Sequence, residues 1–154
     1  MNPDVKVSVT VILMSKDGRT LIMQRPPEKA WGNLWTIAGG KLEDTDGYEL
    51  EPNFRYYSVE ACAVREVREE TGIELDERQL KYLTSITTLQ GEQKRVILSF
   101  YAVIRKKSCD IKVTPAECQK WFWATQFEVE QLRKCKEFIP DIGREILEVF
   151  EKLK

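Results

Sequence analysis

The chain has 154 residues, of which 42% are hydrophobic and 32% are charged, so it can bury one core but is too short for two ordinary domains. Its 24 basic and 25 acidic side chains leave a formal net charge of -1, which excludes a global field that attracts nucleic acid or an anionic membrane. It contains no histidine, which excludes Ser-His and Cys-His nucleophilic mechanisms and favours a hard, oxygen-liganded cation such as Mg²⁺ or Mn²⁺.

The first residues give no targeting signal. Residues 1–6 lack the charged-then-apolar order of a signal peptide, and the apolar run from Val9 to Met14 is too short to cross a bilayer. We therefore expect a soluble, cytoplasmic protein. The four cysteines have no CxxC spacing, so we expect buried or inert thiols rather than zinc ligands.

The N-terminal part of the chain predicts a β-hairpin followed by an irregular stretch. Valines at positions 5, 7, 9 and 11 alternate with polar residues, which is typical of a half-buried strand. Residues 15–19 have turn chemistry, and residues 21–23 form the expected returning strand. A loop then leads into a short strand that we expect to stop at Gly39-Gly40, and residues 44–57 are polar enough to predict an extended loop.

A helix is predicted next, with Ser58 as its N-cap and Gly72 as its left-handed C-terminal residue. Two β-rich runs, residues 82–89 and 96–104, predict a second hairpin. The C-terminal part predicts a strand, a short helix and a last helix. These are residues 121–124, a helix capped by Thr125 that reaches Leu132, and a helix opened by Pro140-Asp141 with an apolar stripe of Ile142, Ile146, Val149, Phe150 and Leu153. We expect one domain over residues 1–154.

Three carboxylates share one face of the central helix. With about 100° per residue, Glu69 and Glu70 fall on either side of Glu66, and Val67 lies where the helix can dock on a sheet. Arg65 precedes Glu69 by one helical turn and can orient it. A solvated charged surface is the alternative explanation for such a run. A divalent cation would relieve the repulsion between the three carboxylates.

Residues 65–73, Arg-Glu-Val-Arg-Glu-Glu-Thr-Gly-Ile, resemble the second half of the Nudix hydrolase signature. The first half departs from the family pattern, because the stretch between Gly40 and Arg65 is about 11 residues longer. Asp46 has the spacing of the first signature Glu when counted from Gly40, whereas Tyr57 has it when counted back from Arg65. The extended loop of residues 44–57 would then lie inside the signature.

The resemblance implies a Nudix-type α/β/α sandwich around a mixed β-sheet, and a MutT-like pyrophosphohydrolase that needs Mg²⁺ or Mn²⁺. Glu117, in a loop before the strand at 121–124, is similar in position to a distant acidic residue of some family members, and Glu92 is the alternative. The catalytic residues so implied are Arg65, Glu66, Glu69 and Glu117. The implied metal ligands are the Gly39 carbonyl, Glu66, Glu69, Glu70 and Glu117.

The expected substrate is a nucleoside triphosphate or a related nucleotide or diphosphate. The close approach of the chain at Gly40 and the charges of Arg25, Lys41 and Arg95 would provide substrate contacts, although each charge is also explained as an ordinary surface residue. The aromatic residues around the signature, Trp31, Trp35, Phe54, Tyr56 and Tyr57, are candidates for stacking on a base. A homodimer stays open, as does the number of metal ions.

Two alternative functions are kept. One is a catalytically silent Nudix-like ligand-binding module, which the complete set of Glu66, Glu69 and Glu70 disfavours. The other is a prenyl diphosphate isomerase of the same fold. That enzyme would need a catalytic cysteine beside the metal, and Cys62 stands one turn before Glu66.

Overall fold

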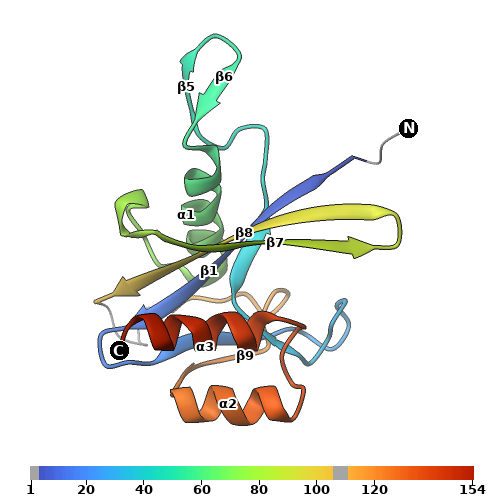
Figure 1. The fold of residues 1–154 in the computed structure, drawn as a ribbon, viewed down its shortest axis with the longest axis vertical. Coiled ribbons are helices and arrows are strands. Elements are labelled where there is room, and N and C mark those ends of the chain that lie inside the picture. The colour runs from blue at the N-terminus through green and yellow to red at the C-terminus, as the bar shows by residue number, and fades with distance from the viewer. Residues whose placement is uncertain (1–3, 106–110) are drawn as a thin grey trace.

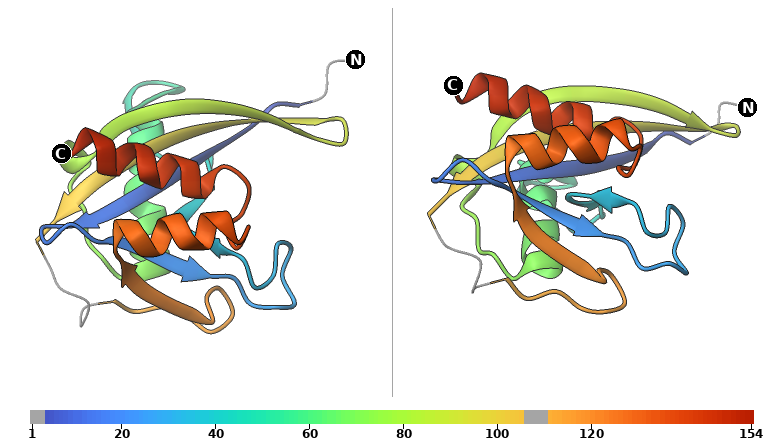
Figure 2. Two further views of the ribbon diagram at one scale, coloured as in Figure 1. Left: turned by 60° about the horizontal axis from the view of Figure 1, so that its bottom comes forward. Right: turned by 90° about the horizontal axis from the view of Figure 1, so that it is seen from below.

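The computed structural model describes residues 4–105 and 111–154, and within these ranges seven strands form one mixed sheet. Helix α1 (Ser58–Thr71) packs on one face of the sheet, whereas α2 (Gln126–Lys134) and α3 (Ile142–Lys152) cover the other (Figure 1, Figure 2). The predicted α/β/α sandwich is therefore confirmed.

The main path of the sheet is β3-β2-β1-β8-β7, with β4 paired to β1 and β9 paired to β2. Strands β1 and β8 are parallel, and the other pairs are antiparallel. Both predicted hairpins are present, as β1–β2 and β7–β8. The strands of the sheet are β1 (Lys6–Ser15), β2 (Thr20–Gln24), β3 (Trp35–Thr36), β4 (Ala38–Lys41), β7 (Lys81–Gln90), β8 (Gln93–Ile104) and β9 (Lys120–Ala124).

Strand β1 is the centre of the molecule and is buried on both faces. Val9 and Val11 belong to the core under α1, whereas Ile12 and Met14 belong to the core under α2 and α3. The prediction of a half-buried strand was therefore wrong for most of β1. Alternation indicates a strand with one solvated face, but β1 has a helical layer on either side, so its inner residues are apolar without alternation.

Strand β4 continues through the paired glycines instead of ending at them. Gly39 and Gly40 pair with Thr10 and Val9 of β1, and the strand ends at Lys41. The expectation that the strand stops at the glycines was wrong. Gly39 lies so close to β1 that an added Cβ would be 2.5 Å from the Val9 carbonyl oxygen, so the glycine is needed for close packing inside the sheet.

The ends of α1 agree with the prediction at one terminus only. Gly72 adopts φ 76° and donates its N–H to the Arg68 carbonyl, as predicted. The N-cap is Tyr57 at φ 57° and not Ser58, which is the first helical residue and donates its hydroxyl to the Arg55 carbonyl at 3.3 Å. Thr125 caps α2 as predicted, through a capping box with Glu128.

The last helix buries most of its predicted apolar stripe. Ile142, Ile146, Val149 and Phe150 are buried, but Leu153 lies past the helix end and is exposed. Among the described residues, no helix has the length and apolar character needed to cross a membrane.

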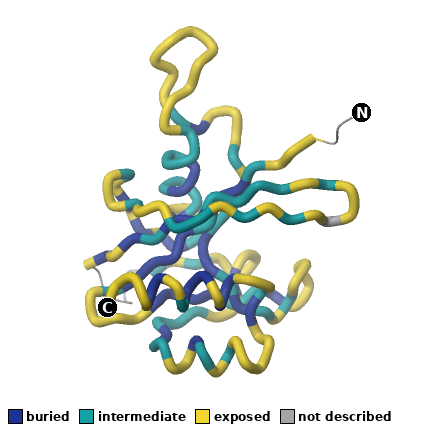
Figure 3. Tube along the Cα trace, viewed as in Figure 1, coloured by how far each residue is buried: buried dark blue, intermediate teal, exposed yellow. Residues whose placement is uncertain are grey.

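The stretch between β4 and α1 contains a second, separate two-stranded sheet. Strands β5 (Tyr48–Glu51) and β6 (Phe54–Tyr56) form a hairpin that projects from the body beyond the start of α1 (Figure 1). The hairpin is exposed along its whole length (Figure 3). Asp46, which precedes it and was included in the expected loop, is instead buried.

Candidate active site

Helix α1 presents its carboxylates because its opposite side is fixed in the core. Cys62, Ala63 and Val67 are completely buried against the sheet. Strand β4 passes so close to the helix that a Cβ on Gly40 would be 2.2 Å from the carboxyl carbon of Glu66. A side chain at position 40 would displace the Glu66 carboxylate from this position, so glycine lets the backbone of β4 lie directly beside the face of α1 that carries Glu66, Glu69 and Glu70, the carboxylate face.

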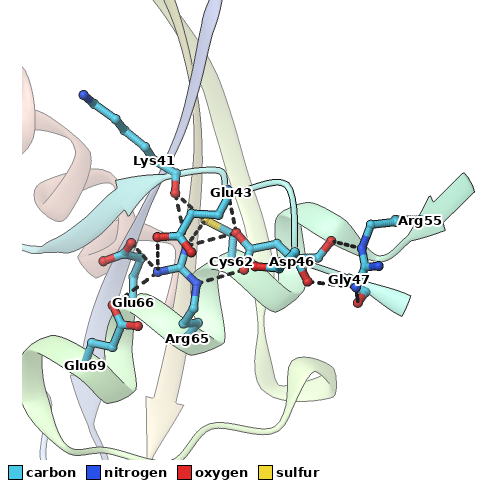
Figure 4. A network of polar contacts seen from close by, with 10 residues as sticks. Lys41, Glu43, Asp46, Gly47, Arg55, Cys62, Arg65, Glu66 and Glu69 are labelled. Atoms are coloured by element: carbon cyan, nitrogen blue, oxygen red, sulfur yellow. Dashed lines mark hydrogen bonds and ion pairs between the residues drawn. The ribbon is translucent and has the colours of Figure 1, made fainter. Parts of the chain in front are cut away.

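Arg65 is the centre of the polar network on this face (Figure 4). Its Nε and Nη2 donate to the two carboxylate oxygens of Asp46 at 2.8 and 2.9 Å. Its Nη1 donates to Glu66 at 2.8 Å and to Glu69 at 3.2 Å. The pairing of Arg65 with Glu69, expected from their spacing, is therefore present. Glu43 lies at 3.6 Å from the same Nη1.

Asp46, and not Tyr57, faces Arg65. The Asp46 side chain is only 4% exposed and also accepts the Glu43 N–H at 2.8 Å. The Arg65 guanidinium lowers the pKa of the Asp46 carboxyl, so this group stays charged and the pair is a two-point anchor. Tyr57 is exposed at the N-cap of α1. The spacing counted from Gly40 thus identifies the partner of Arg65.

Glu66 and Glu70 are carboxylates held away from water. Burial is the main cause that raises the pKa of both, to about 8 for Glu70, whose pKa is raised further by the charges of Glu66 and Glu117. The Gly39 N–H points at Glu70 Oε2 from 3.4 Å. Glu69 differs, because its side chain is 53% exposed and forms an ion pair with Arg65. The helix face therefore has an enclosed part and a solvated part.

The oxygen donors on this face fit a hard divalent cation chemically. Burial raises the pKa of both Glu66 and Glu70, and the charge of Glu66 raises the pKa of Glu70 further; a bound cation would favour the charged forms of both. Arg65 already occupies one oxygen of Glu66 and one of Glu69. In the described ranges, no three acidic or cysteine side chains stand in a metal-binding arrangement.

Glu117 lies where its charge reaches Glu70. It is exposed in a turn that leads into β9, and its N–H donates to the Thr114 carbonyl at 3.0 Å. Its charge contributes to the raised pKa of Glu70, so the two carboxylates are near enough to interact electrostatically. Glu92, the alternative, is exposed at the tip of the β7–β8 hairpin, away from α1 (Figure 1).

The three basic residues expected at the substrate do not gather at the carboxylates. The Lys41 side chain points away from the Arg65 network, and its carbonyl accepts Arg65 Nη2 at 3.1 Å (Figure 4). Arg25 donates its Nε to the Ala30 carbonyl at 2.7 Å and so holds the loop after β2. Arg95 shares a face of β8 with Ser99, which contacts Glu145 of α3, so it lies across the sheet from α1.

The candidate stacking residues are also divided. Trp35 is buried in the core under α2 and α3, where it packs edge-on against Phe122. Phe54, Tyr56 and Tyr57 are exposed on or beside the projecting hairpin, and Trp31 is exposed in the loop after β2. These five residues therefore do not form one aromatic surface.

Cys62 is a buried structural thiol. Its Sγ donates to the Lys41 carbonyl at 3.5 Å, and burial together with the Asp46 charge raises the pKa of the thiol to about 12. A thiol held in its neutral form is a poor nucleophile and a poor acid at neutral pH. This environment disfavours the cysteine-dependent isomerase.

Sequence reasoning missed two polar residues of the fold. Arg55, in the projecting hairpin, donates to the backbone carbonyls of Asp46 and of its two neighbours in the chain. Contacts with backbone carbonyls leave no pattern in the sequence from which they could be predicted. Glu145 is buried in α3 and accepts the Ser99 hydroxyl at 2.6 Å. Its position three residues after Ile142, inside the apolar stripe, was the signal that could have identified it.

Comparisons with known proteins agree with this geometry. A family model described as NUDIX domain matches residues 4–147. The CTP pyrophosphohydrolase of Escherichia coli (strain K12) is 35% identical over 68 residues, which cover 44% of this chain and 42% of that protein. The match therefore spans less than half of the relative's length.

Solved structures share the fold over almost the whole chain. The MutT protein from Methanosarcina mazei Go1 has a TM-score of 0.71 at 18% identity, covering 99% of this chain and 97% of that one. The NUDIX domain of Shewanella oneidensis NrtR, complexed with ADP ribose, has a TM-score of 0.74 at 17% identity, covering 98% and 90%. At such identities the likeness concerns the fold.

Proposed function

The chain belongs to the NUDIX domain family, and we propose from this that it is a metal-dependent pyrophosphohydrolase acting on a nucleoside triphosphate or a related nucleotide. The observation that carries the proposal is the enclosed carboxylate pair, Glu66 and Glu70, beside the backbone of Gly39 and Gly40. Such a pair is costly without a cation, so its presence supports a site that holds one.

We propose Glu66, Glu69, Glu70, the Gly39 carbonyl and Glu117 as the groups that hold Mg²⁺ or Mn²⁺. A bound divalent cation would neutralise the diphosphate oxygens and lower the pKa of the attacking water. Arg65 orients two of these carboxylates through one nitrogen, while Asp46 keeps the remaining nitrogens occupied. The guanidinium is thus held in place during turnover.

Glu117 is proposed either as the last of these ligands or as the general base that activates the attacking water. Glu66 already accepts a hydrogen bond from Arg65, whereas Glu117 lies on an exposed turn open to solvent water. From that turn its charge reaches Glu70. A carboxylate beside the metal ligands and open to water can accept a proton as the water attacks phosphorus. As the bond from the water oxygen to phosphorus forms, the bond from that phosphorus to the bridging oxygen breaks, and the other phosphate group leaves with the bridging oxygen.

The first substrates to test are nucleoside triphosphates. Cytidine nucleotides come first, because part of the chain is similar to the CTP pyrophosphohydrolase of Escherichia coli. We expect release of pyrophosphate or phosphate that depends on Mg²⁺ or Mn²⁺ and disappears in Glu70→Gln. The panel should add ADP-ribose, a nucleotide sugar and a prenyl diphosphate. Tight binding of one compound without turnover under all metal conditions would contradict the proposal and support a ligand-binding module.

A further inference from the structure

Arg55 fixes the backbone that carries Asp46. Although it lies in the exposed hairpin, its guanidinium donates to three consecutive carbonyls: Thr45 at 2.8 Å, Asp46 at 3.1 Å and Gly47 at 2.7 Å. A planar cation that meets three carbonyl oxygens holds their peptide groups in one orientation. Its ion pair is weaker, since Glu49 stands at 3.7 Å with an exposed side chain.

Gly47 shows how tightly this segment is packed. It adopts φ 94°, and an added Cβ would be 2.6 Å from both the Ser58 hydroxyl and the Tyr56 carbonyl oxygen. The backbone that leaves Asp46 is therefore pressed between the base of the hairpin and the first turn of α1. The hairpin and the Asp46 segment form one local unit.

Asp46 connects this fixed backbone to the carboxylate face through its hydrogen bonds with Arg65. Its two oxygens occupy Nε and Nη2 of Arg65, so Nη1 is the nitrogen that contacts Glu66 and Glu69 (Figure 4). If the Asp46 segment shifted, the freed guanidinium would turn towards Glu66 and Glu69. It would then compete with any cation for their oxygens.

We propose that Arg55 is a positioning residue for the carboxylate face, which acts through Asp46 and Arg65. The inserted hairpin would thus be a brace that keeps Nε and Nη2 of Arg65 on Asp46, so that Nη1 is the nitrogen that contacts the oxygens of Glu66 and Glu69. The consequences for catalysis and for cation binding rest on the proposed function, but the consequence for the position of Arg65 does not. Mutation of a residue that orients a metal ligand without touching the metal typically weakens metal binding by about 10- to 100-fold.

The test compares Arg55→Met and Arg55→Lys with two matched controls. Glu49→Gln removes the ion pair of Arg55 but leaves its carbonyl contacts, and Arg78→Met removes an exposed arginine near the hairpin that pairs with Asp76. The first readout is the ¹H–¹⁵N NMR signal of the Arg65 Nε–H in metal-free protein. The second is Mn²⁺ binding by calorimetry without substrate.

We expect Arg55→Met to shift the Arg65 Nε–H signal, to speed its exchange with water, and to weaken Mn²⁺ binding about tenfold. For Arg55→Lys, both the shift of the Arg65 Nε–H signal and the loss of Mn²⁺ affinity should be smaller than for Arg55→Met, because an ammonium group can reach only part of the carbonyl set. Both controls should match wild type. Circular dichroism melting shows whether Arg55→Met retains its fold; the peripheral position of the hairpin predicts that it does.

An unchanged Arg65 signal together with Mn²⁺ binding within twofold of wild type in Arg55→Met would overturn the proposal. If all four variants keep the Arg65 signal and the Mn²⁺ affinity of wild type, the contacts of Arg55 stabilise the hairpin and have no effect on the carboxylate face. If no substrate is hydrolysed by any protein, the proposed function fails, yet the NMR signal of Arg65 still decides whether Arg55 positions Arg65. The two failures are therefore distinguishable.

Discussion

At the scale of single residues, neighbouring glutamates on α1 have different environments. Glu69 is solvated and held by Arg65, whereas Glu70 is enclosed beside Gly39 and close to two other carboxylates. A surface charge costs little to keep, but an enclosed charge among like charges destabilises the fold. The two residues should therefore respond differently to neutralisation.

We predict that Glu70→Gln abolishes most metal-dependent turnover while the metal-free protein keeps or slightly gains stability. Because the pKa of Glu70 is raised to about 8, its carboxyl is largely protonated at neutral pH without metal, and the neutral amide changes stability little there. Above about pH 8 the amide avoids an enclosed negative charge near Glu66, and its oxygen can still accept the Gly39 N–H. Differential scanning calorimetry of metal-free protein gives the stability, and the rise in Tm on adding Mg²⁺ gives the binding. Wild type should show that rise and Glu70→Gln should lose it.

Glu69→Gln is the comparison for this experiment. It should also lower turnover, but its effect on the metal-free Tm should be close to zero because the side chain is solvated. Near wild-type kcat in Mg²⁺ for either variant would remove that residue from the proposed ligand set.

Glu117 gives a second prediction at this scale. If it is the base, Glu117→Gln should lower kcat by roughly 10²- to 10⁴-fold with little change in metal affinity. If it is a ligand instead, the Mg²⁺ concentration needed for half-maximal rate should rise. Steady-state kinetics across a Mg²⁺ titration separates these outcomes, with Glu92→Gln as the matched variant from the distant hairpin tip. Unchanged kcat, KM and metal dependence would leave Glu117 as a surface residue.

At the scale of elements, the sequence predicted those parts whose cause is local. The central helix follows from its carboxylate and apolar faces and from Gly72, and α2 follows from the capping pair of Thr125 and Glu128. These features need no distant partner. The pairing of β1 with both β4 and β8 is different, because it depends on contacts between distant parts of the chain.

The candidate site shows the same division. The spacing of Arg65 and Glu69 predicted their contact, and the spacing from Gly40 offered Asp46 as one of two alternatives. Arg55 was not predictable, because its partners are backbone carbonyls. The left-handed Tyr57 cap was not predictable either, since tyrosine has no preference for that conformation. Arg25 and Arg95 do not lie beside the carboxylates: Arg25 holds the loop after β2, and Arg95 lies on the opposite face of the sheet from α1, neither of which their residue type indicates.

The hairpin allows a prediction for a whole element. Replacing residues 48–56 with a short Gly-containing connector should preserve the fold, because both strands are exposed and belong to a separate two-stranded sheet. Asp46 and Gly47 must be kept, since Asp46 is buried and anchors Arg65. Circular dichroism should show a melting temperature close to that of wild type.

A replacement that also removes Asp46 is the contrasting variant. It leaves Arg65 with an unpaired part of its guanidinium in a poorly solvated place, so its melting temperature should fall clearly below that of the shorter replacement. Cooperative unfolding of the shorter replacement at a much lower temperature than wild type would show that the hairpin itself stabilises the domain.

At the scale of the whole molecule, one sheet separates two apolar cores, and among the described residues one carboxyl side chain is completely buried in a core. Glu145 of α3 is 1% exposed and faces the sheet, where it accepts the Ser99 hydroxyl, which in turn accepts the Thr10 hydroxyl at 3.1 Å. This chain links the last helix to β8 and β1. Burial raises the pKa of Glu145 from 4.5 to about 7.

This raised pKa predicts how the free energy of unfolding depends on pH. The folded protein keeps a proton on Glu145 between pH 4.5 and about 7, where the unfolded chain has lost it. The resulting stability is therefore fully present below pH 4.5, falls as the pH rises towards 7, and is absent above that. The shift corresponds to a loss on the order of 3 kcal/mol. Asp141 and Glu148 raise the pKa of Glu145, whereas Arg144 lowers it.

Glu145→Gln isolates this contribution, because the amide oxygen still accepts the Ser99 hydroxyl while the side chain no longer titrates. Urea unfolding from pH 4.5 to 8.5 should show the variant gaining stability relative to wild type as the pH rises, with a plateau above about pH 7. Ser99→Ala is the second variant: it removes the hydrogen bond that lowers the pKa of Glu145, so the fall in stability should extend to higher pH. A constant difference between wild type and Glu145→Gln over this range would mean that Glu145 is charged in the folded protein. The link between α3 and the sheet would then be an ordinary carboxylate acceptor, independent of pH.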